Sequence, residues 1–394
     1  MASLYVTSNN ARKVVVVIIA VIVIILLGDT ILRVSDAVRQ QTTTDRRFYV
    51  DPDRALGTIE APKITGIQLD NTNVPIVQES VHPKFPDVSY VYKIEQPREK
   101  LNTFENATKT ATALGFSAQG FKDQGNNDFI WSTTDLTRNV EFNKVNQVWS
   151  LDTVYENNTN AKKQKSMLQD INGYIGRVPS VLNSLLFSTA VGFQSPKIDA
   201  RYLVRSGQGD ITETQDYKQA NYVELNVFRK IAQSDLKPSA DQPKLLTGEI
   251  KPQATVGVVY KTDPRTGEFS SIVSNDASNL SRDMFQMDFV NFEYGSKGSY
   301  FIVTPEEAFS RIQKGQGSLV ALSAEGTDYF EPYVKLKVNR FIVDARKTEL
   351  GFYEPETWTG FVYPIYILTG RAELEDGRLA KFTFYVDAVK RLEN

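Results

Sequence analysis

The sequence predicts an α+β protein in which an N-terminal transmembrane helix precedes tandem modules, each an antiparallel sheet packed on one helix. Three observations lead to this fold class. Residues 14–27 are fourteen apolar residues in a row, eleven of them Val or Ile. Tyr (18) and Phe (22) are abundant, and such side chains suit half-buried sheet faces. A helical pattern followed by a series of short strands recurs about three times along the chain.

The apolar run is the first expected element. Its fourteen residues would rise roughly 21 Å as a helix, which is short of the ~30 Å hydrocarbon core of a bilayer. Extending the helix to Val34 gives a rise of roughly 31 Å and places Asp29 and Arg33 four residues apart, where they can pair near the head-groups. The residues that we expect to define this anchor are Val14, Ile18, Ile22, Leu27, Asp29 and Arg33.

A cleaved signal peptide is the alternative to an uncleaved anchor. Arg12 and Lys13 fit the basic start of a signal peptide, but no small-x-small cleavage site follows closely. Lys and Arg on the two sides of the span do not by themselves orient it. Because long domains translocate largely regardless of flanking charge, we expect a single-pass protein of the cell membrane, with a cytoplasmic N-terminus and an outside C-terminal domain.

The remaining chain is long enough for two or three domains. We expect a polar stalk without periodicity after the span, and then three α+β modules. The expected ranges are 1–13 for the cytoplasmic N-terminus, 14–34 for the span, 35–60 for the stalk, and 61–155, 156–250 and 251–394 for the modules.

Each module has one predicted helix. Thr103 can cap the first, which places Phe104, Ala107 and Ala111 on one face before Gly115 ends it. The second follows the amphipathic spacing of apolar residues between Leu168 and Leu185. The third begins at a capping box, Thr304-Pro-Glu-Glu307, and should span 306–314.

Alternating apolar residues and turn signals predict the strands. Strands are expected at 88–94 and 222–231, and in the C-terminal module at 333–343, 347–353, 362–370 and 379–386. Asp376-Gly377 should close the last hairpin. Asp263-Pro-Arg-Thr-Gly-Glu268 is predicted to be the tip of a hairpin between strands 256–260 and 269–273.

Composition excludes several classes of function. The net charge is −2, with 45 Lys and Arg against 47 Asp and Glu, and this balance argues against a nucleic-acid partner. Cys is absent, so disulfides, thiolate nucleophiles and Cys-ligated metals are impossible. An envelope protein of this size without disulfides is typical of bacteria. We expect no cofactor and no metal site.

Few residues are candidates for chemistry. The single histidine, His82, is followed by Pro83 and Pro86, and this Pro-rich neighbourhood predicts a surface loop. Glu306 and Glu307 are explained by the start of a helix, where acids interact well with the helix dipole. The one aromatic and acidic cluster that suits binding, of a sugar for example, lies in an apparent turn and consists of Tyr353, Glu354, Glu356 and Trp358.

The last ninety residues carry a family resemblance. A capped helix with Ala308 and Phe309 is followed by Tyr353, by Pro364-Ile-Tyr366 and by a closing Tyr385-Val-Asp-Ala388. This order resembles the PepSY-type module and the ectodomains of YycH/YycI-type regulatory proteins. The earlier helices, each followed by Gly-Phe, are similar to modules of single-pass proteins from small-genome bacteria. The resemblance implies a cystatin-like topology, no enzyme activity, and regulation through contact with a membrane partner such as a sensor kinase.

We therefore expect an outside-facing binding or regulatory protein without catalytic activity, whose partners are the membrane and an envelope protein. Two alternatives remain open. The first is a structural or surface-assembly component of the envelope, which would self-associate through exposed sheet edges. The second is an acid-dependent envelope hydrolase, which would need two carboxylates ~5–10 Å apart in a cleft.

Overall fold

A computed structural model describes most of the chain beyond its first fifty residues. The described residues are 52–69, 74–123, 125, 127–153, 173, 175–176, 182, 195–205, 211–232, 256–274, 287–290, 292–324 and 336–391. They belong to one unit, Val50–Asn394. The expected anchor at 14–34 lies outside the described residues.

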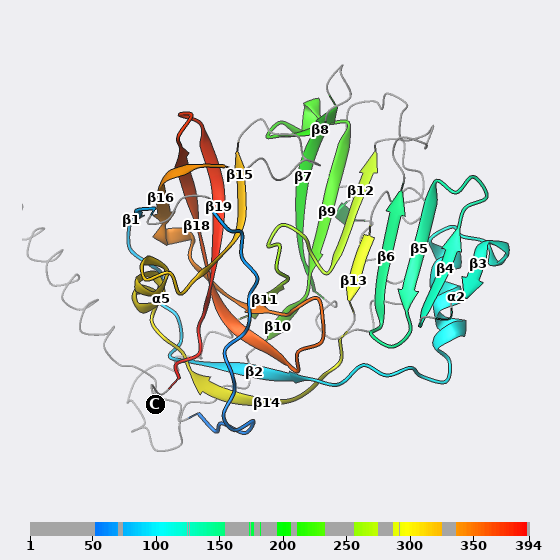
Figure 1. Ribbon diagram of the computed structural model, residues 1–394, viewed down its shortest axis with the longest axis horizontal. Coiled ribbons are helices and arrows are strands. Elements are labelled where there is room, and N and C mark those ends of the chain that lie inside the picture. Colours follow the sequence, from blue (N-terminus) through cyan, green and yellow to red (C-terminus); the bar gives the residue numbers. More distant parts are fainter. Residues whose placement is uncertain are drawn as a thin grey trace, which may run out of the picture. The chain divides into compact units, whose positions relative to one another are not determined.

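The largest element is a ten-stranded sheet (Figure 1). Its strands come from the expected ranges of all three modules. They are β1 (Ile76–Glu79), β2 (Val88–Ile94), β10 (Lys230–Ala232), β11 (Val256–Tyr260), β14 (Tyr294–Phe301), β15 (Ser318–Ala324), β16 (Val338–Asp344), β17 (Glu349–Tyr353), β18 (Phe361–Leu374) and β19 (Leu379–Asp387).

The long strand β18 organises this sheet. One edge of β18 pairs with β19 through the hairpin at Asp376-Gly377, where Gly377 has a φ of 82° as the turn requires; this hairpin was predicted correctly. The other edge pairs first with β17 and then with β16. Between these pairings, residues 345–348 interrupt the strand and contain a short 3₁₀ helix, η5 (Ala345–Lys347); we refer to this segment as the bulge. β1 pairs in parallel with β16, and β11 with β17.

Two smaller antiparallel sheets complete the fold. The five-stranded sheet has the order β13 (Met287–Val290), β6 (Val148–Thr153), β5 (Arg138–Asn143), β4 (Asp128–Ser132) and β3 (Phe121–Asp123). The four-stranded sheet has the order β12 (Phe269–Ser274), β9 (Tyr222–Phe228), β7 (Lys197–Arg205) and β8 (Ile211–Thr214). Two further 3₁₀ helices, η1 (Ala118–Gly120) and η4 (Tyr217–Gln219), lie in connections.

The two fully described α-helices pack with their apolar faces against the sheets, as the sequence pattern predicts. α2 (Thr103–Ala113) buries Ala107 and Ala111 in a core with Trp131 and Trp149 of the five-stranded sheet. Its N-cap is Asn102 rather than the predicted Thr103, whose hydroxyl accepts a hydrogen bond from the Lys100 N–H instead. The core around α2 also contains side chains of β9.

α5 (Pro305–Gln313) has the predicted capping box. Thr304 accepts from the N–H of Glu307, and the Glu307 carboxylate accepts from the N–H of Thr304. The helix buries Ala308 and Ile312 against the aromatic face of β16 and β19.

The α+β fold class predicted from the sequence is wrong. Of the described residues, 48% lie in strands and 14% are helical, and α2 and α5 are the two α-helices described in full. Strands from distant parts of the chain merge into one large sheet instead of each module forming its own sheet on one helix. Helical periodicity is local, whereas a strand edge accepts partners from anywhere in the chain. The predicted helix at 168–185 lies almost entirely outside the described residues, although Ile175 and Leu182 pack on the core around α2. In the described part of the chain, no helix combines the length and hydrophobicity of a membrane span.

Candidate functional site at the junction of the sheets

The three sheets are joined where the chain crosses from one to another. Arg229 stands between β9 of the four-stranded sheet and β10 of the ten-stranded sheet. Residues 261–268 lead from β11 back to β12, and 291–293 lead from β13 to β14. Five polar side chains gather at these crossings, four of them buried and Tyr294 half-buried, and we refer to them as the junction cluster: Arg229, Lys261, Glu268, Tyr294 and Glu354.

The segment 261–268 corrects the predicted hairpin. Both flanking strands exist, but β11 pairs with β10 and β17, whereas β12 pairs with β9. The turn residues Asp263-Pro-Arg-Thr-Gly-Glu268 therefore form a crossing between two sheets. A turn signal shows that the chain changes direction, but it does not determine whether the two strands pair with each other.

Two buried ion pairs form the centre of the junction cluster. Arg229 Nε donates to Glu268 Oε2 at 2.9 Å, and both side chains are at most 1% exposed. Lys261 Nζ pairs with Glu354 Oε2, and that carboxylate is fully buried. Tyr294 links the two pairs, because its hydroxyl donates to Glu354 Oε1 at 2.8 Å and its ring lies 4.8 Å from the Arg229 guanidinium. The cluster therefore contains two positive and two negative groups, which compensate one another in the interior.

The surroundings shift the pKa values of the two carboxyls in opposite directions. Burial raises the pKa of Glu268 to about 7, and the attraction of Arg229 only partly offsets this. Burial alone would also raise the pKa of Glu354, but Lys261 and Arg229, with the hydrogen bond from Tyr294, outweigh it and hold that pKa below its usual value. Glu354 is thus the firmly ionised carboxylate, and Glu268 is the one that neutral pH can titrate.

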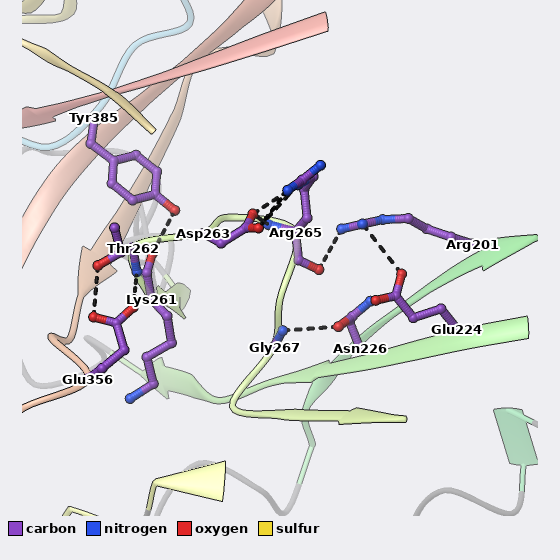
Figure 2. Close-up of polar contacts among 10 residues, drawn as sticks. All are labelled: Arg201, Glu224, Asn226, Lys261, Thr262, Asp263, Arg265, Gly267, Glu356 and Tyr385. Carbon is purple, nitrogen blue, oxygen red and sulfur yellow. Dashed lines mark hydrogen bonds and ion pairs between the residues drawn. The ribbon is translucent and has the colours of Figure 1, made fainter. Parts of the chain in front are cut away.

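The crossing segment is fastened on both sides (Figure 2). On one side, Glu356 accepts from the N–H and the hydroxyl of Thr262, both at 2.8 Å, and the Tyr385 hydroxyl donates to the Lys261 carbonyl at 3.1 Å. On the other side, Asn226 Oδ1 accepts from the N–H of Gly267 at 3.1 Å. A Cβ at position 267 would lie 2.6 Å from the backbone N and O of Val227, so this close approach requires glycine.

Arg201 and Asp263 add contacts at the turn of the crossing. Arg201 of β7 donates to the Arg265 carbonyl and pairs with Glu224 of β9 at 3.4 Å. Asp263 pairs with Arg265 within the turn itself, at 2.8 Å. The segment is thereby held against the four-stranded sheet and against the end of β17 at the same time.

The structure divides the binding cluster predicted from the sequence. Tyr353 is 2% exposed, and Glu354 points into the junction cluster. Glu356 is on the surface and fastens Thr262. Trp358 is 42% exposed, and its indole N–H donates to the Ile94 carbonyl at 3.2 Å. The two acids therefore both hold the crossing segment, the buried Glu354 through Lys261 and the exposed Glu356 through Thr262.

Sequence reasoning missed Arg229, Lys261, Glu268 and Tyr294. Arg229 carried the clearest signal, because it directly follows the seven-residue buried strand Tyr222–Phe228. A cation in such a position is fully buried only when an acid pairs with it. The identity of that acid, Glu268, is not readable from the sequence, because 38 residues separate the two in the chain.

The expected surface position of His82 is wrong. The side chain is 6% exposed, and both ring nitrogens have hydrogen-bond partners. Two of its flanking residues, Pro83 and Pro86, indicate irregular backbone, but irregular backbone is not necessarily exposed. The expected anchor residues from Val14 to Arg33 lie outside the described residues.

The junction cluster is suited to holding sheets together. Each of its carboxylates already contacts a cation, and its four charged groups are buried from solvent. Among the described residues, no three His, Asp or Glu side chains are placed to hold a metal ion. No protein-family model matches the chain, and no curated protein matches its sequence. Function has therefore to be inferred from the residues themselves.

Proposed function

We propose that this protein is a single-pass, membrane-anchored binding protein of the bacterial envelope, which regulates a partner protein by contact rather than by catalysis. The apolar run at 14–27 would tether it with the N-terminus in the cytoplasm, and the β-rich unit would act outside. The resemblance to YycH/YycI-type regulators supports a membrane partner such as a sensor kinase.

The observation that carries this proposal is the use of the charged residues at the sheet junction. Lys261 and Glu354 form an ion pair inside the protein, and Glu356 accepts hydrogen bonds from Thr262 at its surface. These groups fix the crossing between two sheets and so stiffen the unit. A rigid, multi-sheet unit on a tether suits recognition, because a preorganised surface loses little entropy on binding and the tether raises its local concentration.

The sidedness of the protein is testable with single cysteines, since the natural chain has none. Leu136 is 63% exposed in the described unit, and Ser8 precedes the apolar run. We expect a membrane-impermeant maleimide to label Leu136→Cys on intact cells, and to label Ser8→Cys only after permeabilisation. Labelling in the reverse order would contradict an outside-facing unit.

Binding is testable by cross-linking the full chain in intact cells. We expect a discrete heteromeric adduct that disappears when Ile18→Arg and Ile22→Arg interrupt the apolar run. Ile64→Val is a matched control for substitution elsewhere in the chain and should retain the adduct. Adducts between copies of the chain alone would instead favour the structural alternative, and the absence of any adduct would contradict a binding role.

A further inference from the structure

His82 joins three parts of the fold that are far apart in sequence. It follows β1 in the chain, its Nδ1 lies 2.8 Å from Thr348 Oγ1 at the end of the bulge between β16 and β17, and its ring lies 6.2 Å from the ring of Phe309 on α5. Its Nε2 lies 3.0 Å from Gln78 Oε1 on β1. The side chain is 6% exposed, and it is the only histidine of the chain.

The hydrogen bonds select one neutral form of the ring. Gln78 Nε2 donates to the Ser80 carbonyl at 2.9 Å, which turns Gln78 Oε1 toward His82. Because that oxygen only accepts, His82 Nε2 must carry the proton and donate. Nδ1 is then free to accept from the Thr348 hydroxyl. A second proton would turn Nδ1 into a donor, and the Thr348 hydroxyl would have to reverse its role and accept.

The charged groups around the ring do not balance the positive charge that a second proton would bring. Burial lowers the pKa of His82 below its usual value, while Glu306 in the first turn of α5 and the backbone of Ala345 act in the opposite direction without overcoming it. From β1, the facing group is the neutral amide of Gln78. On the bulge, Arg346 and Lys347 have side chains 73% and 72% exposed and pair with Asp344.

β1 depends on this contact more than an interior strand would. It is four residues long and joins the sheet by parallel pairing with β16. The turn after it holds Ser80 at a φ of 73°, a left-handed conformation that is costly for a residue other than glycine. The Gln78 amide bonds both Ser80 and His82, so the same side chain supports the strained turn and the histidine.

We propose that His82 is a pH-sensitive latch, which holds β1 and the turn after it against α5 and the bulge at neutral pH and releases them when it is protonated. The neutral ring satisfies both partners, whereas the protonated ring is a buried cation without a paired acid in contact. Release would free the edge of β16 that β1 covers. This device depends on the described unit alone and is independent of the proposed membrane tether.

The sign of the pH dependence follows from linkage. The pKa of His82 is lower in the folded state than the ordinary 6.5, so its contribution to stability is fully present above pH 6.5. It is lost progressively as the pH falls below 6.5 toward the folded-state pKa. The open population of β1 should rise at most about tenfold for each pH unit in that interval.

Hydrogen exchange of the full chain tests the latch. Peptides covering Ile76–Val81 are compared between pH 7.5 and 5 after correction for intrinsic exchange, with peptides of β19 as the internal reference. We expect acid to deprotect β1 selectively in the natural chain and not in His82→Gln. The single histidine also provides one imidazole Cε1–H signal in an NMR titration. Its midpoint should lie below 6.5 and match the pH at which the deprotection of β1 levels off.

Glu306→Gln keeps the test valid if His82→Gln does not fold. Glu306 is exposed and favours the protonated ring, so its removal should lower both the NMR midpoint and the pH at which the deprotection of β1 levels off, and it should deepen the deprotection at pH 5. The latch is refuted if β1 exchange does not change with pH, if His82→Gln keeps the acid response, or if Glu306→Gln shifts the NMR midpoint but leaves deprotection in place.

Discussion

The junction cluster and the His82 site are both buried, but they keep polar groups in the interior in different ways. In the junction cluster, Lys261 and Glu354 form a buried ion pair, and the attraction of Lys261 helps to hold the pKa of Glu354 below its usual value. His82 instead lies against a neutral amide and a neutral hydroxyl, and it remains neutral itself. Charge pairing makes the contact between Lys261 and Glu354 costly to break, whereas hydrogen bonding to a neutral ring makes the His82 site sensitive to acid.

Within the junction cluster, Glu268 adds a pH response of opposite sign to that of His82. Because burial raises its pKa from 4.5 to about 7, the folded state binds this proton more readily than the unfolded state. Its contribution to stability is full below pH 4.5 and is lost as the pH rises through 7. The contribution of His82 is lost as the pH falls below 6.5. Acid therefore stabilises the crossing segment 261–268 through Glu268 and loosens β1 of the ten-stranded sheet through His82.

The largest expected effect comes from removing one charge of the junction cluster. Lys261→Met leaves two buried carboxylates facing one cation, Arg229, and should lower the free energy of unfolding by about 3–5 kcal/mol. Adding Glu354→Gln restores equal numbers of positive and negative groups and keeps an acceptor for Tyr294. The double variant should therefore be more stable than Lys261→Met in denaturant unfolding of the full chain. If the two substitutions simply add, the pairing account of this cluster is wrong.

A smaller effect is expected at the close approach of the crossing segment. Gly267→Ala places a Cβ against the Val227 backbone and should cost about 1–3 kcal/mol, the range of an overpacked interior. Gly57→Ala is the control, because the Cβ position of Gly57 has open space around it. This variant should lose stability only through the strain of an alanine at a φ of 71°. Thermal unfolding of both variants separates crowding from backbone strain. Equal losses would contradict a steric role for Gly267.

The pH response of Glu268 provides a third comparison. Glu268→Gln cannot ionise, so its stability lacks the loss that the natural chain suffers between pH 4.5 and about 7. The free energy of unfolding of the natural chain minus that of the variant should therefore fall as the pH is raised through this window, as measured by thermal unfolding at pH 5, 6, 7 and 8. A difference that grows with pH would show that the ionised pair with Arg229 outweighs the cost of burial.

The smallest effect is expected from removing a surface ion pair of β1, the strand that His82 contacts. Arg371 of β18 pairs with Glu79 of β1, with side chains 54% and 49% exposed. Arg371→Ala should change the free energy of unfolding by at most about 1 kcal/mol, because solvent screens such pairs. It should also leave the pH dependence of β1 exchange unchanged. If this variant loses the acid response, the response depends on the ion pair between Arg371 and Glu79 and not on His82.

Several local features were predictable from the sequence. The capping box at Thr304 and Glu307 determines the start of α5, because its two hydrogen bonds involve residues three positions apart. The Asp376-Gly377 turn determines the β18–β19 hairpin, since one residue of positive φ sets the chain reversal. Of the candidate site, Glu354 and Glu356 were singled out, but their partners Lys261 and Thr262 were not. Those partners lie more than ninety residues earlier in the chain.

The sequence by itself thus determined the start of α5 and the chain reversal between β18 and β19, because capping and turn chemistry act over a few residues. The tertiary structure alone decided which strands pair and which polar groups are buried. β1 and β2 join a sheet whose other strands lie over a hundred residues away, and β11 and β12 diverge although a turn connects them. Backbone edges carry the same donors and acceptors whatever the sequence, so their pairing is settled by which faces can be buried together. That choice placed Arg229 beside Glu268 and enclosed His82.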